Sequence, residues 1–364
     1  MLTLVRYSEI GTKGDNRNYF EELLARNIMA KLNESSVKGR VNTEESRLIV
    51  ESEERVDHLL SKIFGISSFS AVERIPSSVE EIVKRVVRIE VNGSFRVTVN
   101  RRDKNFPITS QEFSAKLGEL VLDANPRAKV DLFNYEKNIG IDIGSRFTYI
   151  YEVTVQGVGG MPVRSQGKGV ALISAGIDSP VAAYMMMKRG MELNLIHYFQ
   201  SSRTLEKVFR NKELLEQYSP YPIEIKVMDH RKMIGKTVME LRKSKEQRWT
   251  CIFCKREMYK EGENYAREIG GKAIITGEDL GQVASQTLDN LNTIEEKVNI
   301  PVFRPLIGFD KIEIERLSEK IGAFDIFLSD TSSCDCHFLP SRPRTKSSPE
   351  EMNEVELKIL GRSG

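Results

Sequence analysis

A short apolar strand, a turn of small residues and a helix follow one another between residues 170 and 190, and this order restricts the fold. Val170–Ile173 is a continuous apolar run, which is typical of a parallel strand buried on both faces. Pro180 suits the first turn of a helix, and the helical stretch Val181–Gly190 ends on a basic pair and a glycine. The sequence therefore predicts an α/β domain whose tight turn directs several backbone N–H groups at one point, as in phosphate sites.

The turn between this strand and this helix carries the residues that would surround a phosphate. Its small and polar positions are Ser174, Gly176, Asp178 and Ser179. Their spacing resembles the SGGxDS signature of the PP-loop ATP pyrophosphatases, which cleave ATP between the α and β phosphates, and differs from the Walker loop. Ala175 stands where that family usually has glycine, and its methyl group fits only if the local φ is negative and no phosphate oxygen needs the space. The alternative is an ordinary corner of an α/β domain without a ligand.

Length and composition indicate a globular protein of two or three domains. The 364 residues are 40% hydrophobic and 29% charged, and no apolar stretch approaches the length of a membrane span. The N-terminus lacks the layout of a signal peptide, so we expect a cytoplasmic protein with no membrane partner. A net charge of +2 does not by itself indicate nucleic acid, so RNA binding has to rest on local clusters of charge.

Two small α+β units are expected before the phosphate loop. Residues 1–60 combine strand patterns with a helix at Asn18–Leu32, whose apolar residues recur with a period of 3.6. Residues 61–165 contain Phe95–Asn100, in which apolar and polar side chains alternate as in a half-buried strand. Further strands of these units are expected at 2–7, 47–51, 130–133 and 139–143.

The glycine-rich segment Gly157–Pro162 marks a domain boundary. From residue 166 to 340, strand and helix patterns alternate, which is typical of a doubly wound domain with a parallel sheet. We therefore predict an α/β catalytic domain preceded by two small α+β domains, with residues 341–364 as a polar C-terminal tail. Apolar strands of the catalytic domain are expected at 170–173, 194–199 and 272–276.

Five longer motifs follow one another along the chain, at Arg6–Gly14, Arg96–Pro107, Lys255–Tyr259, Thr276–Leu291 and Arg304–Lys311. This ordered series resembles the tRNA 4-thiouridine synthetase family and covers nearly the whole chain. The resemblance implies that the first two motifs belong to a ferredoxin-like domain and to an RNA-binding THUMP domain. It implies that the remaining three belong to a PP-loop ATP pyrophosphatase domain.

The resemblance also implies an activity, that of an ATP-dependent tRNA sulfurtransferase that makes 4-thiouridine at uridine 8. ATP would adenylate the C4 oxygen of the base and release pyrophosphate, which turns a poor leaving group into AMP. Cationic groups and backbone donors would stabilise the charge on the transferring phosphoryl group. The partners implied are tRNA, ATP and a sulfur donor such as a cysteine desulfurase, and the family resemblance suggests a homodimer.

Site residues carried over from the family fall mainly at the ends of the predicted strands, where ligands of such domains bind. Asp178 is a catalytic candidate because Mg²⁺ prefers carboxylate and phosphate oxygens. Ser174, Gly176, Asp178 and Ser179 fall on the pyrophosphate loop. The other ATP contacts implied are Leu172, Ile173, His197, Tyr198, Arg256, Gly277 and Gln286. Lys13, Arg17, Arg101, Arg102 and Lys104 are the RNA-binding candidates, since backbone contact requires positive charge.

The four cysteines stand in two pairs, Cys251 with Cys254 and Cys334 with Cys336. In a cytoplasmic chain such pairs indicate metal or redox chemistry more often than structural disulfides. We expect no rhodanese domain, which delivers sulfur in other members of the family, so these cysteines are the sulfur-handling candidates. Cys251, Cys254 and Cys334 are the ligands expected for an iron–sulfur cluster. Alternatively, catalytic Cys334 or Cys336 carries a persulfide and forms a disulfide with a neighbouring cysteine when sulfur is transferred. The four thiols could also bind zinc or be inert.

Two other functions remain open at this stage. The family resemblance also permits delivery of sulfur to thiamine-thiazole synthesis. A different class of function follows if Ala175 impairs the phosphate loop, because the chain would then bind tRNA without catalysing a reaction.

Overall fold

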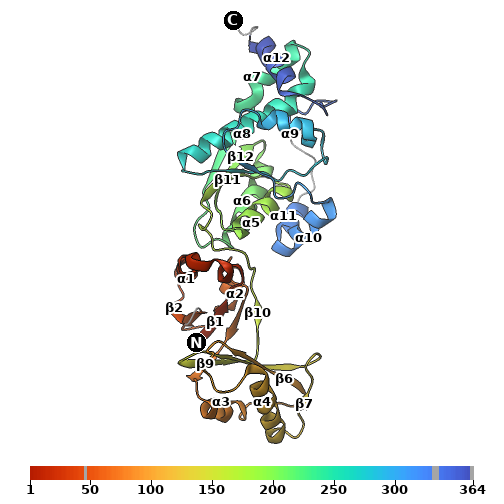
Figure 1. The fold of residues 1–364 in the computed structure, drawn as a ribbon. Coiled ribbons are helices and arrows are strands. Elements are labelled where there is room, and N and C mark those ends of the chain that lie inside the picture. The colour runs from red at the N-terminus through yellow and green to blue at the C-terminus, as the bar shows by residue number, and fades with distance from the viewer. Residues whose placement is uncertain (45–46, 330–335, 361–364) are drawn as a thin grey trace. The chain divides into compact units, whose positions relative to one another are not determined.

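The computed structural model describes residues 1–44, 47–329 and 336–360. The chain divides into two compact units, Met1–Pro162 and Val163–Gly364. The division falls at the end of the predicted linker Gly157–Pro162. Figure 1 shows the elements of each unit. No helix in the described ranges is long and apolar enough to cross a membrane.

The first unit contains two five-stranded sheets. The first has the order β10-β4-β1-β3-β2, and its neighbouring strands are antiparallel. The predicted helix Asn18–Leu32 is confirmed as part of α1, which buries Leu24 and Ile28 in the core. The elements of this part are β1 (Leu2–Arg6), α1 (Arg17–Glu34), β2 (Gly39–Glu44), β3 (Arg47–Ser52), α2 (Asp57–Leu60), β4 (Ser68–Ala71) and β10 (Val155–Gln156).

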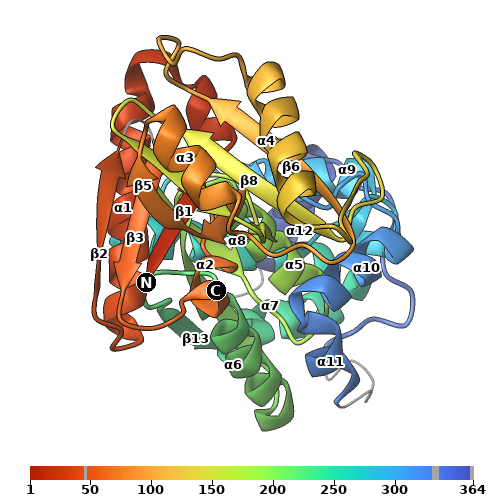
Figure 2. The ribbon, with the colours of Figure 1, turned by 90° about the horizontal axis from the view of Figure 1, so that it is seen from below.

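The second sheet has the order β5-β9-β8-β6-β7, and α3 and α4 cover one of its faces (Figures 1 and 2). The alternation at Phe95–Asn100 lies within β6, where Phe95 and Val99 are buried. The expected strand at 130–133 is wrong beyond Val130, because only Lys129–Val130 pairs with β6. The elements are β5 (Glu73–Pro76), α3 (Val79–Val86), β6 (Ser94–Arg101), α4 (Ser110–Ala124), β7 (Lys129–Val130), β8 (Lys137–Ile143) and β9 (Phe147–Tyr151).

Strand pairing groups the first unit differently from the predicted division at residue 60. Both β4 and β10 pair within the first sheet, although both lie beyond that residue. The second sheet takes its strands from Glu73 to Tyr151. The chain therefore leaves the first sheet after β4 and returns to it at β10.

The second unit is built on a parallel sheet of order β13-β12-β11-β14-β15, which confirms the predicted doubly wound α/β domain. Its strands are β11 (Lys168–Leu172), β12 (Glu192–Phe199), β13 (Ile225–Asp229), β14 (Ile274–Ile275) and β15 (Val302–Phe303). The first strand, β11, is central. The chain adds β12 and β13 on one side and then β14 and β15 on the other. The order of strands thus reverses between β11 and β14, where ligands of such sheets bind.

Helices cover both faces of this sheet. α5 and α6 pack on one face with α10 and α11, and α7 and α8 lie on the other with α9 and α12 (Figure 1). Their bounds are α5 (Asp178–Lys188), α6 (Ser202–Glu216), α7 (His230–Lys243), α8 (Thr250–Glu268), α9 (Leu288–Glu295), α10 (Lys311–Ile321), α11 (Ala323–Leu328) and α12 (Pro349–Leu360).

The C-terminal tail is part of the second unit. Met352, Val355 and Ile359 of α12 are buried in one apolar cluster with residues of α7, α8 and α9. The Ser347 hydroxyl donates to Asn290 Oδ1 at 2.6 Å, which fixes the approach to α12. Within Pro349–Leu360, the charged residues of the sequence belong to the exposed face of a helix whose other face is apolar.

Candidate active site

The predicted phosphate loop connects β11 with α5 and is held together by its two serines. The Ser174 backbone N–H donates to the Ser179 hydroxyl at 2.8 Å, and the two hydroxyl oxygens are 2.9 Å apart. Asn211 on α6 donates to the Ser174 carbonyl at 3.3 Å. No described side chain caps the N-terminus of α5, so its first N–H groups remain directed at the loop. This is the arrangement of an anion site at a helix N-terminus.

Gly277 brings the end of β14 against this loop. A Cβ atom at residue 277 would stand 2.6 Å from the Ser179 nitrogen and 2.7 Å from the Asp178 carbonyl carbon. Only glycine fits such an approach of backbone to backbone. Residues that are about a hundred positions apart in the sequence therefore meet at the point where the strand order reverses.

Ala175 causes no backbone strain in the loop. Positive φ among the described non-glycine residues occurs at Ser36, Arg164 and Lys245, and Ala175 is not one of them. The condition on the local φ of Ala175 is met, so its backbone gives no reason to expect an impaired loop. The second condition, space for a phosphate oxygen, stays a prediction.

Asp178 and Lys311 form an ion pair beside the loop. Lys311 Nζ lies 3.1 Å from Asp178 Oδ1, and Lys311 is the first residue of α10, after the N-cap Asp310. Burial raises the pKa of Asp279, and the negative charge of nearby Asp178 raises it further. Asp279 therefore belongs to the same group of charges. A cation and two carboxylates thus adjoin the phosphate loop. The predicted site residues did not include Lys311, although it ends the motif Arg304–Lys311.

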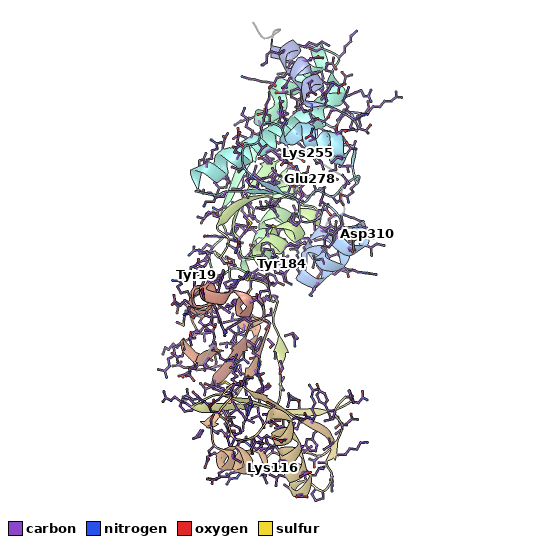
Figure 3. All side chains as sticks on the ribbon, in the orientation of Figure 1. Tyr19, Lys116, Tyr184, Lys255, Glu278 and Asp310 are labelled. Carbon is purple, nitrogen blue, oxygen red and sulfur yellow. The ribbon has the colours of Figure 1, made fainter. Side chains whose placement is uncertain are left out.

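Glu278 is the centre of a buried polar network next to Gly277. Lys255 Nζ lies 2.6 Å from Glu278 Oε1, and Arg304 Nε donates to Glu278 Oε2 at 2.9 Å. The Tyr259 hydroxyl donates to the same carboxylate. Burial alone would raise the pKa of Glu278, but the positive charges and hydrogen bonds lower it to about 2. Figure 3 shows Lys255 beside Glu278. The network fixes the backbone that follows β14.

Arg256 lies on another side of α8 from Lys255. Its Nη2 is 2.7 Å from Glu356 Oε1 of α12, and its side chain is 4% exposed. The structure therefore does not bring Arg256 to the phosphate loop with the other predicted ATP contacts. It places Lys255, one residue earlier, in the network next to Gly277.

The remaining predicted ATP contacts lie at the ends of β11 and β12 or near Asp279. His197 Nδ1 is 2.9 Å from the Ile173 carbonyl oxygen, while its Nε2 is buried and has no partner among the described residues. Burial lowers the pKa of His197, so a neutral ring is favoured. The Tyr198 hydroxyl donates to a backbone carbonyl of α8. With its amide nitrogen as donor, Gln286 reaches Asp279 Oδ1 at 3.0 Å. Leu172 is half-buried and packs against the apolar clusters on the α7–α8 face of the sheet.

Two of the four cysteines lie near the start of α8, and a third follows the gap in the described residues. Cys254 Sγ is 3.1 Å from His230 Nε2. Burial raises the pKa of the Cys254 thiol to about 12, and the charges of Cys336 and Cys251 also raise it. No group of three or more histidine, cysteine or acidic side chains within the described ranges is arranged to hold a metal ion. Cys334 lies outside the described residues, so the expected ligand set stays a prediction.

The RNA-binding candidates already have interactions within the first unit, with one exception. Arg17 Nε lies 2.7 Å from Glu21, and Arg101 Nη1 donates to the Phe106 carbonyl at 2.9 Å. Arg102 Nε lies 3.8 Å from Asp142, and Lys13 Nζ is 5.6 Å from the ring centre of Phe20. Lys104 is exposed on the loop after β6. The sequence located the positive charges but gave no indication of their partners.

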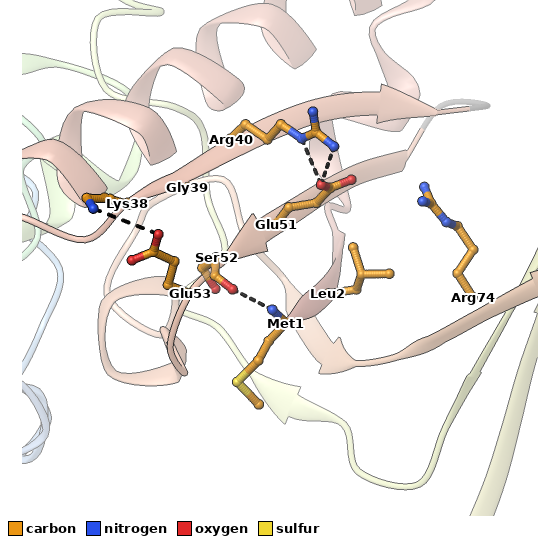
Figure 4. Close-up of a pocket in the computed structure, with 9 residues that line it drawn as sticks. All are labelled: Met1, Leu2, Lys38, Gly39, Arg40, Glu51, Ser52, Glu53 and Arg74. Carbon is orange, nitrogen blue, oxygen red and sulfur yellow. Dashed lines mark hydrogen bonds and ion pairs between the residues drawn. The ribbon is translucent and has the colours of Figure 1, made fainter.

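An open hollow on the first sheet is separate from all of these residues (Figure 4). Two of its charge pairs are internal, since Arg40 lies 2.6 Å from Glu51 and Lys38 lies 4.0 Å from Glu53. Arg74 pairs with Glu44 outside the hollow, and the N-terminal ammonium donates to the Ser52 carbonyl. The hollow is lined by Met1, Leu2, Lys38, Gly39, Arg40, Glu51, Ser52, Glu53 and Arg74.

Comparison with known families agrees with the fold and with the family resemblance. Residues 164–360 match the family described as "Thiamine biosynthesis protein (ThiI)". The chain belongs to the ThiI family. Residues 2–70 match the ThiI ferredoxin-like domain and residues 70–153 match the THUMP domain. The resemblance to 4-thiouridine synthetases predicted from the motifs is thereby confirmed.

Relatives of this ThiI-family chain are similar over nearly their whole length. A probable tRNA sulfurtransferase of Methanocaldococcus jannaschii is 40% identical, with 99% of this chain and 97% of the relative covered. One of Thermococcus kodakarensis is 36% identical with the same coverage. The chain also resembles a solved structure, the crystal structure of a 4-thiouridine synthetase–RNA complex with bound ATP. The two sequences are 33% identical and the TM-score is 0.85, with 99% of this chain and 94% of that chain covered. This ThiI-family chain is thus a tRNA sulfurtransferase by family.

Proposed function

We propose that the second unit binds ATP and adenylates uridine 8 of tRNA, and that sulfur then replaces the C4 oxygen to give 4-thiouridine. The observation that carries the proposal is the meeting of the Ser174–Ser179 loop, Gly277 and the Lys311–Asp178 pair at the reversal of strand order. It is supported by the related 4-thiouridine synthetase, which was crystallised with RNA and ATP.

The phosphates of ATP would lie at the N-terminus of α5. Backbone N–H groups of the loop and the helix dipole favour negative charge there. Lys311 Nζ, on an exposed side chain, would exchange part of its contact with Asp178 for a phosphate oxygen. His197 Nε2 is a buried polar atom near Ile173 that a nucleotide base would satisfy.

The reaction requires stabilisation of the charge that moves from the α phosphate to pyrophosphate. The uridine C4 oxygen attacks the α phosphorus, and pyrophosphate leaves towards the loop. Positively charged and N–H groups held in place before the reaction lower the barrier most. Asp178 and Asp279 fit Mg²⁺, because carboxylate and phosphate oxygens are its preferred ligands. Bound Mg²⁺ would neutralise phosphate charge, and Asp178 would hold it.

Sulfur would be delivered from a persulfide on a cysteine of this chain. Cys251 and Cys254 fit part of an iron–sulfur ligand set, whose third expected member, Cys334, lies outside the described residues. A persulfide would be loaded by a sulfur donor such as a cysteine desulfurase. Its terminal sulfur attacks C4 of the adenylated uridine, and AMP leaves.

The first unit would hold the tRNA. Its THUMP domain supports this role, and the family resemblance suggests a homodimer in which both copies contribute. The exposed Lys104 is the predicted cation best available for a phosphate of the RNA.

The proposal is tested with purified protein and tRNA transcripts. Pyrophosphate release that depends on both ATP and tRNA, and that is lost when uridine 8 is replaced by cytidine, would support adenylation at this position. Release that is unaffected by that replacement would overturn it. The description of the matched family favours thiamine synthesis as a second role, and growth of a deletion strain without thiamine tests that role separately.

A further inference from the structure

His230 lies next to the cysteines, although no motif in the sequence indicated it. It follows β13 directly as the first residue of α7, and it is 1% exposed. Its Nε2 is 3.1 Å from Cys254 Sγ. Its other ring nitrogen, Nδ1, is buried and has no partner in the part of the chain that the structure describes. Leaving a buried nitrogen unsatisfied costs about 1–3 kcal/mol, so a purely structural role gives a poor account of this histidine.

The segment that carries Cys336 packs against the same imidazole. The Phe338 ring centre is 5.7 Å from that of His230. Phe338 and Cys254 pack against the same apolar cluster between α7, α8 and α12. Cys336 is half-buried and stands two residues before Phe338. His230 therefore contacts both Cys254 and the segment that begins at Cys336.

We propose that His230 is a positioning residue for sulfur transfer: it holds the Cys254 sulfur towards Cys336, so that these two cysteines form a disulfide when sulfur leaves Cys336. This role rests on the proposed function and identifies Cys254 and Cys336 as the two cysteines that act in it. His230 touches neither ATP nor the base, so its role is to orient a thiol.

Release of the sulfur from Cys336 requires a second thiol, which supplies the electrons that break the S–S bond. Attack of the Cys336 persulfide on adenylated uridine forms a C4–S bond, releases AMP and leaves uridine joined to Cys336 through S–S. Cys254 then attacks the Cys336 sulfur and breaks that S–S bond. The products are 4-thiouridine and a Cys254–Cys336 disulfide, and the thiol proton ends on N3 of the base. The two cysteines are oxidised by two electrons and the transferred sulfur is reduced by two. An external dithiol restores the pair.

The experiment uses the full chain with ATP, tRNA and glutathione persulfide as the sulfur source. The Cys254–Cys336 disulfide is quantified by peptide mass mapping during a single turnover. His230→Phe removes the hydrogen bond and keeps a ring, and we expect disulfide formation to slow about tenfold, the upper range for one such bond. His230→Gln, whose amide nitrogen can replace Nε2, should recover most of the rate. Pyrophosphate release should be unchanged in both variants.

The outcomes separate the two proposals. If the unmodified protein releases no pyrophosphate when ATP and tRNA are both present, adenylation itself is refuted. Normal release with equally fast disulfide formation in His230→Phe would refute the positioning role, as would a disulfide from Cys254 to Cys334. If His230→Phe does not fold, His230→Leu, which also lacks a ring nitrogen, takes its place. Disulfide formation in His230→Leu as fast as in the unmodified protein would count against His230.

Discussion

Lys255 Nζ lies 2.6 Å from Glu278 Oε1, next to the glycine that touches the phosphate loop, whereas the side chain of Arg256 pairs with Glu356 of the C-terminal helix. Successive residues of a helix point about 100° apart. Of these two successive residues, Lys255 therefore lies near the nucleotide loop, whereas Arg256 anchors α12. We expect substitutions at the two positions to affect ATP binding differently.

Lys255→Met should weaken ATP binding about tenfold, because Glu278 loses one of its two charge partners and the strand end against the loop is held less firmly. Arg256→Met, the matched control, should leave the ATP dissociation constant unchanged. It should lower the free energy of unfolding, since Glu356 keeps Lys297 but loses its buried partner. Isothermal titration with ATP and urea unfolding measure the two effects. A larger loss of ATP affinity in Arg256→Met would restore the assignment drawn from the family resemblance.

Asp178→Ala and Lys311→Met should each reduce pyrophosphate release about 10²–10³-fold, the range found when one donor to a transition state is removed. Both residues lie in the second unit, so tRNA binding should be retained. Lys320→Met, on the same helix as Lys311, is the control and should release pyrophosphate normally. Filter binding of labelled tRNA provides the second readout. Loss of both activities together would mean that the division of labour between the units is wrong.

Acid should remove the contribution of Glu278 to stability. Its folded pKa of about 2 is below the ordinary value of 4.5, so its contribution is complete above pH 4.5 and is lost as the pH falls towards 2. Glu278→Gln leaves Lys255 without its carboxylate and Arg304 with Glu295 alone, and should cost about 3–5 kcal/mol at pH 7. The difference in unfolding free energy between the two proteins should shrink at pH 3. A difference independent of pH would show that the charge of Glu278 contributes little.

The parts of the site that were predictable are local in the chain. The strand, loop and helix around Ser174–Ser179 follow from apolar runs and turn residues that are adjacent in sequence. Lys311 is 133 residues from Asp178, and Arg304 is 26 residues from Glu278, so no periodic pattern could pair them. The doubly wound fold was predicted because strands and helices alternate, whereas the return of β10 to the first sheet depends on a pairing of distant strands.

Charge patterns were the least reliable guide to function. Arg17, Arg101 and Arg102 stand in a basic part of the sequence, but each is within reach of an acceptor of its own unit. A count of positive residues does not show which of them are already paired. His230 was missed for the opposite reason: a single histidine has no pattern, and its contact with Cys254 arises only when α7 and α8 pack.

Ala175→Gly decides whether the departure from the family signature matters. The backbone at residue 175 is not in the left-handed region, so glycine would remove no strain, and a glycine in a loop adds freedom to the unfolded chain. We therefore expect tRNA-dependent pyrophosphate release to change less than about twofold and the unfolding free energy to fall by about 0.4–1 kcal/mol. The measurements are steady-state release at saturating ATP and urea unfolding. A sharp increase in release would mean that the methyl group blocks a phosphate oxygen and that the natural chain is an impaired enzyme.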